Sequence, residues 1–269
     1  MSKVVWITGC ASGVGLQLAN TFYSRGYRVV ATDVNFDGLT HCAEEHQWAS
    51  DRVLCRRLDV VSSDDWQTIL KDVVSIWGKI DYLFNVAGYL KPGFGHQTSI
   101  EEIDRHIDIN LKGLIYGAQL VANHMVNQQS GHIINISSMA GLAAIPGLSL
   151  YSASKFAVRA FSLAMAEEVL EHGVKVTVIC PDAIQTPMLT LQEDYEEAAM
   201  TFSGPKTLTV EDLEHVVFNR VLKKAPVEVM LPIGRGVLAK LGNLFPGLTR
   251  PLIRHLRQKG QKVQKQRKA

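Results

Sequence analysis

The sequence lacks several features that would each define a class of protein. Its 269 residues contain no run of about eighteen apolar residues, so we expect no transmembrane helix. The N-terminus, MSKVVWITG, enters a strand-like run at once and does not have the layout of a signal peptide. The cysteines form no CxxC pair, which favours free thiols in a cytoplasmic protein over disulfides or a metal site: Cys10, Cys42, Cys55 and Cys180.

Acidic residues are absent from the last part of the chain. From residue 229 onward there are ten Lys and Arg residues and no Asp or Glu, whereas the first 228 residues hold 18 Lys and Arg against 26 Asp and Glu. The chain is therefore an acidic body with a basic extension. The body contains no repeat or low-complexity linker, and 46% of all residues are hydrophobic, enough for one large core. We expect one domain over residues 1–232 and an extension over residues 233–269.

Apolar runs typical of strands alternate with longer helical patterns through the body. The runs are rich in Val, Ile and Leu without in–out alternation, which indicates strands buried on both faces. Such repeated alternation predicts an α/β fold: one doubly wound (Rossmann) domain with a seven-stranded parallel sheet and helices on both faces. The expected strands are 3–8, 28–33, 52–60, 80–85, 131–137, 174–180 and 227–232, and the expected helices lie near 13–25, 37–47, 63–77, 100–128, 151–171 and 209–223.

A glycine-rich turn, TGCASGVG from Thr8 to Gly15, joins the first strand to the first helix. In this position glycines let the backbone approach a pyrophosphate, whose charge the helix N-terminus favours, so we predict a dinucleotide site. The second strand ends at Asp33, whose carboxylate can accept hydrogen bonds from adenosine ribose and repels a 2′-phosphate. No Arg or Lys lies in the glycine loop or just after Asp33, which favours NAD(H) over NADP(H). A role for Asp33 as a helix cap or turn former before NFDG stays open.

The stretch YSASK places Tyr151 four residues before Lys155, and Ser138 lies thirteen positions before the tyrosine. On a helix, residues i and i+4 share a face, so the phenol and the ammonium can face one site. Taken alone, this short pattern is more often a helix start with a surface lysine.

Four motifs, taken together in their order and spacing, change that interpretation. TGCASGVG, NVAG (85–88), NISS (135–138) and YSASK (151–155) resemble the short-chain dehydrogenase/reductase family, over about residues 3–187 and more loosely to 232. The resemblance implies a catalytic set of Asn110, Ser138, Tyr151 and Lys155. It also implies that Tyr151, Lys155 and the following residues contact the cofactor: Gly9, Ser12, Gly13, Val14, Gly15, Asp33, Asp59, Val60, Asn85, Ala87, Gly88, Pro181, Ile184 and Thr186.

The family pattern implies a mechanism without a metal. Tyr151 would be the general base in oxidation and the general acid in reduction, with its pKa lowered by the Lys155 ammonium and by the positive nicotinamide of NAD⁺. Ser138 would stabilise the substrate oxygen, and Asn110 with a water would link the lysine to solvent. For Asn110 the alternative is a polar residue that kinks a buried helix.

One residue departs from the family pattern. Asp182, in PDAIQTP, stands where the family usually has glycine. It either adopts the conformation that glycine favours or lines the mouth of the site and binds a substrate hydroxyl.

The expected lid, residues 187–206, and the segment 139–150 are rich in apolar residues. They favour a hydrophobic alcohol or ketone of steroid, retinoid or long-chain acyl type. The alternatives are an NADP(H)-dependent 3-oxoacyl-type reductase, a non-catalytic dinucleotide-binding scaffold, and a same-fold enzyme of epimerisation or dehydration. The resemblance also implies a homodimer or homotetramer through the helices at 100–128 and 151–171.

The extension combines an apolar stripe with a basic end. A break is expected around Pro246, and RQKGQKVQKQRKA ends the chain. Two interpretations stay open: an anchor at the surface of a membrane with acidic lipids, or a helix packed on the domain and followed by a solvated end. Nucleic acid is not expected as a partner, since the extension lacks interleaved aromatics and the body is acidic. The stripe consists of Val237, Leu238, Leu241, Leu244, Phe245 and Leu248.

Overall fold

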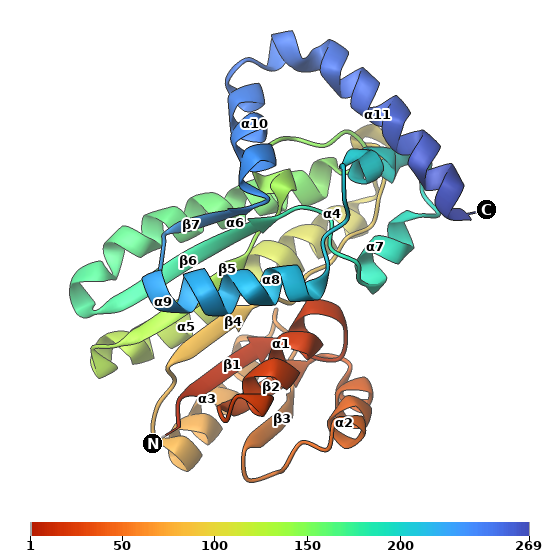
Figure 1. The fold of residues 1–269 in the computed structure, drawn as a ribbon. Coiled ribbons are helices and arrows are strands. Elements are labelled where there is room, and N and C mark those ends of the chain that lie inside the picture. Colours follow the sequence, from red (N-terminus) through yellow and green to blue (C-terminus); the bar gives the residue numbers. More distant parts are fainter. Residues whose placement is uncertain (1, 269) are drawn as a thin grey trace.

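Seven parallel strands form the centre of the structure, a computed structural model that describes residues 2–268 (Figure 1). The strand order is β3-β2-β1-β4-β5-β6-β7, and every neighbouring pair is parallel. This confirms the predicted doubly wound α/β fold. The strands are β1 (Val4–Thr8), β2 (Arg28–Asp33), β3 (Val53–Arg57), β4 (Tyr82–Asn85), β5 (Gly131–Ile136), β6 (Val174–Pro181) and β7 (Glu228–Leu231).

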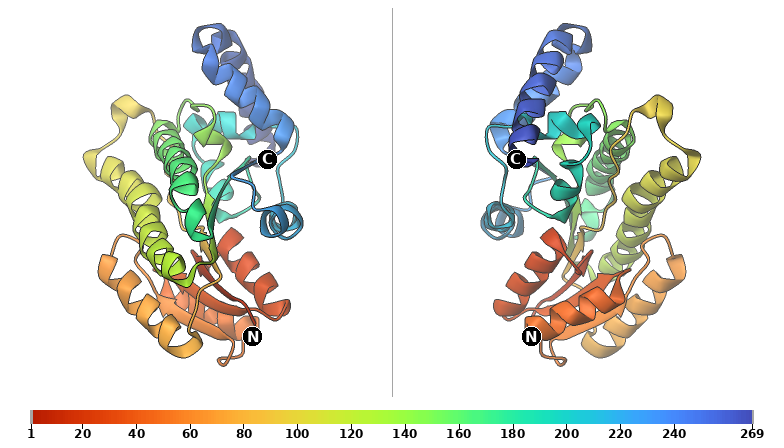
Figure 2. Two further views of the ribbon diagram at one scale, coloured as in Figure 1. Left: turned by 90° about the vertical axis from the view of Figure 1, so that its left-hand side faces the viewer. Right: turned by 90° about the vertical axis from the view of Figure 1, so that its right-hand side faces the viewer.

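Helices cover both faces of the sheet because successive strand side chains point to opposite faces (Figure 2). On β1, Val5 and Ile7 belong to one core cluster, whereas Val4 and Trp6 belong to the other. The first cluster is completed by α1 (Gly13–Ser24), α2 (Phe36–Glu45), α8 (Val210–Val216) and η6 (Val217–Val221), and α9 (Leu222–Lys224) follows it. The second is completed by α3 (Ser63–Trp77), α5 (Gly113–Gln128) and α6 (Ser149–Glu168).

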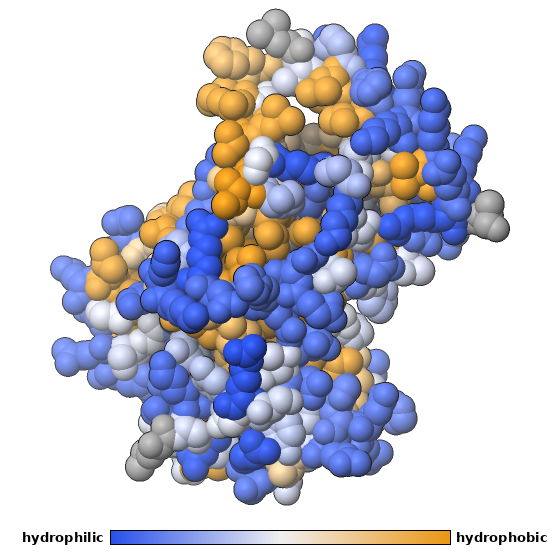
Figure 3. Space-filling model, viewed as in Figure 1, coloured by the Kyte–Doolittle hydropathy of each residue, from blue (hydrophilic) through white to orange (hydrophobic). Residues whose placement is uncertain are grey.

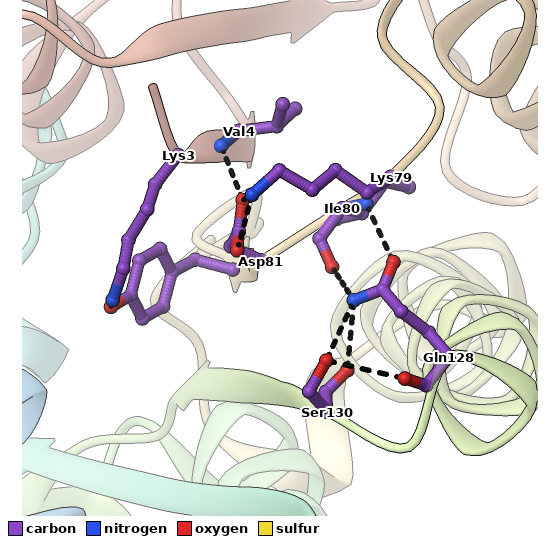
Figure 4. Close-up of polar contacts among 8 residues, drawn as sticks. Lys3, Val4, Lys79, Ile80, Asp81, Gln128 and Ser130 are labelled. Atoms are coloured by element: carbon purple, nitrogen blue, oxygen red, sulfur yellow. Dashed lines mark hydrogen bonds and ion pairs between the residues drawn. The ribbon is translucent and has the colours of Figure 1, made fainter. Parts of the chain in front are cut away.

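Polar contacts fasten the amino ends of the central strands (Figure 4). The Val4 N–H donates to Asp81 Oδ2 at 2.7 Å, and Lys79 forms an ion pair with the same carboxylate at 3.0 Å. The Gln128 side chain bonds both backbone groups of Ile80, at 3.3 and 3.0 Å. These contacts hold the loops at this end in place, and the larger cleft of about 620 Å³ lies at the carboxyl ends of the strands.

Two predicted elements have different limits in the structure. The third strand ends at Arg57 rather than at residue 60, because the Asp59 N–H donates to Asp65 Oδ2 at 2.9 Å and the chain turns away from the sheet. The helix expected over 100–128 is interrupted. It consists of α4 (Ile100–Ile107), a π-helical turn η2 (Asp108–Lys112) and α5.

Two helices form the C-terminal extension, α10 (Ile233–Leu244) and α11 (Pro246–Lys268). The break falls at Phe245, and Pro246 opens the second helix, a position that proline tolerates. The basic stretch is helical and packs on η5 (Glu196–Ser203), which agrees with the interpretation of a helix packed on the domain; its end continues this helix, with many basic side chains exposed. Both helices project beyond the sheet (Figure 2). The predicted stripe residue Leu248 has a side chain that lies outside the described part of the structure.

No helix within residues 2–268 combines the length and apolar character needed to cross a bilayer. All four cysteines are free: three are buried, and Cys55 is half-buried.

We predict that His132 makes the fold sensitive to mild acid. Its imidazole is 4% exposed and lies 2.8 Å from Thr177 Oγ1, and burial, with the Lys175 charge, lowers its pKa from 6.5 to about 4. Between these two values the unfolded chain binds a proton that the folded chain does not, so stability falls as pH falls. The free energy of unfolding should drop by about 2 kcal/mol between about pH 7.5 and about pH 5.

Urea unfolding of the wild type and of His132→Gln at the two pH values measures this effect. The variant should lose that part of the pH dependence, whereas His172→Gln, at an exposed position, should keep it. Equal pH dependence in His132→Gln and the wild type would contradict the assignment.

Candidate active site

A cleft of about 620 Å³ lies at the carboxyl ends of the parallel strands. Its walls include residues from the segments that follow β1, β2, β4, β5 and β6. Open α/β sheets hold their ligands at this edge, where the strand order reverses. The reversal here lies between β1 and β4.

The glycine loop is shaped for a close approach by a ligand. Gly9 has φ +75°, and a Cβ on Gly15 would lie 2.0 Å from the Gly9 carbonyl oxygen, so neither position accepts a side chain. Helix α1 begins at Gly13, with no side-chain cap from Ser12 and no acidic residue in its first turn. The first N–H groups of a helix have no intrahelical partner. The loop therefore offers uncapped donors and positive potential, which fit a pyrophosphate.

Thr8 holds the two sides of the cleft together, a role that the sequence did not reveal. Its Oγ1 accepts hydrogen bonds from the N–H groups of Val86 and Ala87, both at 3.0 Å. The loop after β4 is thereby fixed against the glycine loop. The only sequence signal is a hydroxyl residue at the end of the strand.

Asp33 lies at the carboxyl end of β2 and lines the cleft. Its carboxylate accepts hydrogen bonds from the N–H groups of Ala11 and Asn35, both at 2.9 Å. The cap of α2 is Asn35, whose side chain accepts from the Gly38 N–H. Asp33 therefore acts as a turn former rather than as a helix cap, and it also orders the glycine loop.

Most of the residues implied by the family resemblance meet at this cleft. Asn85 and Asn110 do not line it. Asn85 is buried between strands, where its Nδ2 donates to Asn135 Oδ1 at 2.9 Å. The residues that line the cleft are Gly9, Ser12, Gly13, Val14, Gly15, Asp33, Asp59, Val60, Ala87, Gly88, Ser138, Tyr151, Lys155, Pro181, Ile184 and Thr186.

Three polar side chains come together where β5 ends and α6 begins. Ser138 lies near enough to Tyr151 to lower the pKa of the phenol, and its Oγ accepts the Ala140 N–H at 3.1 Å. Lys155 is 4% exposed; its Nζ lies 5.6 Å from the centre of the Tyr151 ring and donates to the Ile136 carbonyl at 2.9 Å. The i, i+4 spacing thus brings phenol and ammonium to one site.

The protonation behaviour of this group differs from the expectation. Burial raises the pKa of Tyr151 to about 12, and the nearby Ser138 side chain opposes this only in part. Burial also lowers the pKa of Lys155 to about 8. Desolvation therefore dominates the pKa of the phenol, and the expected decrease is not found in the protein alone.

Asn110 lies in the π-helical turn η2 and is buried. Its Oδ1 accepts the Tyr89 N–H at 2.7 Å, and its Nδ2 donates to the Tyr89 carbonyl at 2.8 Å and to Ser154 Oγ at 3.1 Å. The amide therefore ties the loop after β4 to α6. The irregular helix agrees with the alternative of a helix distorted around a polar residue.

The part of the cleft farther from the glycine loop is largely apolar, with a few polar side chains. Tyr89 donates to Glu102 Oε2 at 2.8 Å, and burial and this bond raise its pKa to about 12. Arg105 lies over the Tyr89 ring at 4.2 Å. The apolar wall comes from Leu90, Ile145, Leu148, Met188, Leu189 and Met200.

Asp182 forms an ion pair with Arg235 of α10 at 3.0 Å, and both residues line the cleft. Asp182 is not among the residues with positive φ, so the conformation that glycine favours is not needed here. Burial raises the pKa of its carboxyl, and the guanidinium acts in the opposite direction. The departure from the family pattern thus fastens the end of β6 to the C-terminal extension, and Arg235 is a cleft residue that the sequence did not indicate.

The segment predicted to be the lid contains α7 (Pro187–Gln192) and η5, and the end of α11 packs on it. Gln264 is 5% exposed, and its Nε2 donates to three lid carbonyls at 2.7 to 3.1 Å, those of Gln192, Glu193 and Tyr195. Arg267 forms an ion pair with Glu193 at 3.0 Å. At Gly260 a Cβ would lie 1.9 Å from the Ala199 carbonyl oxygen, so the helix and the lid meet backbone to backbone.

We predict that Gln264→Leu loosens the lid. Three carbonyls would lose their side-chain donor, and the free energy of unfolding should fall by about 1 to 3 kcal/mol. Hydrogen exchange of the amides over residues 193–204 should accelerate. Gln266→Leu, at an exposed position on the same helix, is the matched control. Unchanged exchange of the lid amides in Gln264→Leu would show that the contact does not order the lid.

Two comparisons by sequence both match this chain to dehydrogenases. A family model for short chain dehydrogenases matches residues 3–197. The chain is 36% identical to 2-(R)-hydroxypropyl-CoM dehydrogenase of Xanthobacter autotrophicus over 201 residues, which are 73% of this chain and 80% of that protein.

Solved structures show the same fold. ElxO with NADP bound has a TM-score of 0.77 at 26% identity, over 86% of this chain and 97% of that one. A short chain dehydrogenase/reductase from Burkholderia phymatum in complex with NAD has a TM-score of 0.82 over 93% of this chain and 95% of that one. Its identity is 23%, so this likeness concerns the fold alone.

Proposed function

The chain belongs to the short-chain dehydrogenase/reductase family, and we propose that it is an NAD(H)-dependent oxidoreductase acting on a hydrophobic, lipid-like substrate. It would interconvert a secondary alcohol and a ketone, or a primary alcohol and an aldehyde. The observation that carries this proposal is the meeting of Ser138, Tyr151 and Lys155 in the cleft that the glycine loop also lines.

The cleft fits a nicotinamide dinucleotide because the N-terminus of α1, at the glycine loop, has no side-chain cap and can accept a pyrophosphate. When bound, the dinucleotide supplies the acceptor or donor of hydride, and its oxidised form adds a positive charge beside the phenol. The glycine loop would hold the pyrophosphate and Asp33 the adenosine ribose. The adenine would contact Asp59 and Val60, and the nicotinamide end would contact Pro181, Ile184 and Thr186.

A preference for NAD(H) is supported by Asp33 and by the lack of a basic side chain beside it in the cleft. Arg57 lies opposite Asp33 in the register of β2 and β3. It does not line the cleft, and its guanidinium forms an ion pair with Asp65 at 3.6 Å. The NADP bound to ElxO keeps an NADP(H)-dependent 3-oxoacyl-type reductase as the second candidate. A non-catalytic scaffold is disfavoured, since all four polar positions of the catalytic set are retained.

Tyr151 would move the proton at the substrate oxygen, as base in oxidation and as acid in reduction. Ser138 can donate its hydroxyl proton to that oxygen, since the Ala140 N–H occupies only a lone pair of its Oγ and leaves the O–H available. Lys155, with a pKa of about 8, remains mostly protonated at neutral pH and favours the phenolate. Asn110 would link this group to solvent through a water.

The substrate class is supported by the apolar wall of the cleft, to which the lid contributes Met188, Leu189 and Met200. We also propose a homodimer or homotetramer through the helices at 100–128 and 151–171; α4 exposes two large apolar side chains, Ile100 and Ile103. Free cysteines are consistent with a cytoplasmic location. We propose no nucleic-acid partner.

The proposed role of Tyr151 is tested by Tyr151→Phe. Oxidation of a series of hydrophobic secondary alcohols by NAD⁺, followed by NADH absorbance, should slow by about a hundredfold to ten-thousandfold. The dissociation constant for NADH should change little, because Tyr151 is only one of many residues proposed to contact the dinucleotide and the variant keeps its ring. Tyr116→Phe on α5, outside the cleft, is the control. Substantial turnover by Tyr151→Phe would refute the role, and no activity of the wild type in either direction would refute the proposed function.

The proposed cofactor preference is tested by Asp33→Asn. The amide oxygen can still accept the Ala11 N–H, whereas the charge that repels a 2′-phosphate is removed. The ratio of NADPH to NADH dissociation constants should shift towards NADPH by about tenfold or more, the scale of one hydrogen bond to a charged group. Asp37→Asn, exposed on α2, should leave the ratio unchanged. An unaltered ratio in Asp33→Asn would exclude the ribose contact.

A further inference from the structure

Helix α10 presents an apolar ridge to solvent. Its large side chains lie at i, i+4 and i+7 spacing and are between 44% and 68% exposed. Figure 3 shows them as a continuous orange surface along α10. Monomeric proteins rarely expose contiguous apolar patches of this kind unless the patch meets a partner. The apolar ridge consists of Val237, Leu238, Leu241, Leu244 and Phe245.

Helix α11 has two faces with different functions. Gly260 and Gln264 lie on the face that packs on the lid. The opposite face is basic and exposed, and Figure 3 shows blue side chains along this helix, at the same end of the molecule as the ridge. Within residues 2–268 the following cations of that face form no ion pair: Arg254, Lys259, Lys262 and Lys265.

The partner of this surface must therefore accept apolar side chains and positive charge together. No acidic residue follows Glu228, so a two-fold contact between identical extensions would place cations against cations. An anionic lipid surface meets both requirements, because apolar side chains enter the boundary of headgroups and acyl chains while Lys and Arg remain at the phosphates. We infer that α10 and α11 form a docking surface for an anionic lipid bilayer.

Docking through this surface places the lid side of the cleft beside the bilayer. Arg235 of α10 lines the cleft, and α11 holds the η5 segment that contributes Met200 and Thr201 to it. A lipid-like substrate is concentrated in the bilayer, so the surface would bring the cleft to its substrate. This last step rests on the proposed function, whereas the docking itself does not.

Vesicle co-sedimentation of the full chain tests the docking. The probes are vesicles of phosphatidylcholine alone and of phosphatidylcholine mixed with phosphatidylserine. Binding should be confined largely to the mixed vesicles and should weaken as salt is raised, because exposed charges are screened. The Tyr151→Phe protein should bind as the wild type does, so that failure of catalysis and failure of docking are distinguishable.

Two variants address the two parts of the surface. Lys259→Gln/Lys262→Gln/Lys265→Gln should lower the partition coefficient by about a hundredfold, roughly fivefold for each lost charge. Leu238→Glu/Leu241→Glu should lower it by at least about tenfold, since two apolar groups are lost. The matched controls are Lys71→Gln/Lys175→Gln/Lys224→Gln and Ile76→Glu/Leu170→Glu, at exposed positions on the body; they should bind as the wild type does.

Equal partitioning of the variants, the controls and the wild type would overturn the inference. It would also be overturned if the wild type does not bind mixed vesicles. A third result against it is a wild-type oligomer, seen by analytical ultracentrifugation without lipid, that dissociates in Leu238→Glu/Leu241→Glu. That result would assign the ridge to a second copy of the chain.

Discussion

The pairing of β1 with β4 determines where the chemistry takes place. The chain winds in one direction from β1 to β3 and in the other from β4 to β7, so the loops that leave these two central strands diverge to opposite faces of the sheet. A crevice forms between them, and Thr8 keeps its sides in register through the Val86 and Ala87 N–H groups. Because these neighbouring strands end at the same level, the same ligand can be surrounded by the glycine loop, the loop after β4 and the Ser138 turn.

Burial sets the electrostatic character of the catalytic group. It raises the pKa of Tyr151 and lowers that of Lys155, so the protein favours the neutral form of both side chains. With a pKa of about 8, Lys155 still carries most of its charge at neutral pH, whereas the Tyr151 phenol is uncharged, so a further positive charge that enters with a ligand would favour the phenolate. The coupling of proton movement to an oxidised dinucleotide is consistent with this arrangement.

The sequence was sufficient to predict features that depend on neighbours along the chain. The parallel fold, the glycine loop and the spacing of Tyr151 and Lys155 follow from local periodicity and from recognised motifs. The pKa direction at Tyr151 was not predictable in this way, because desolvation depends on side chains that pack from several elements. The Asp182–Arg235 ion pair was missed for a related reason: its partners lie on β6 and α10, and sequence spacing gives no measure of their separation. The role of Gln264 was not predicted either, because a single glutamine in a basic stretch gives no indication from sequence that the lid carbonyls lie next to it.

The contact between α11 and the lid has a consequence for how the protein is made. The residues that line the glycine-loop side of the cleft lie between Thr8 and Gly88 and are translated well before Gln264 and Arg267. N-terminal segments begin to fold during synthesis, so the dinucleotide half of the cleft can assemble on the nascent chain. Residues 187–206 gain their contacts with Gln264 and Arg267 only after these later residues have been synthesised, so this side of the cleft matures after the glycine-loop side.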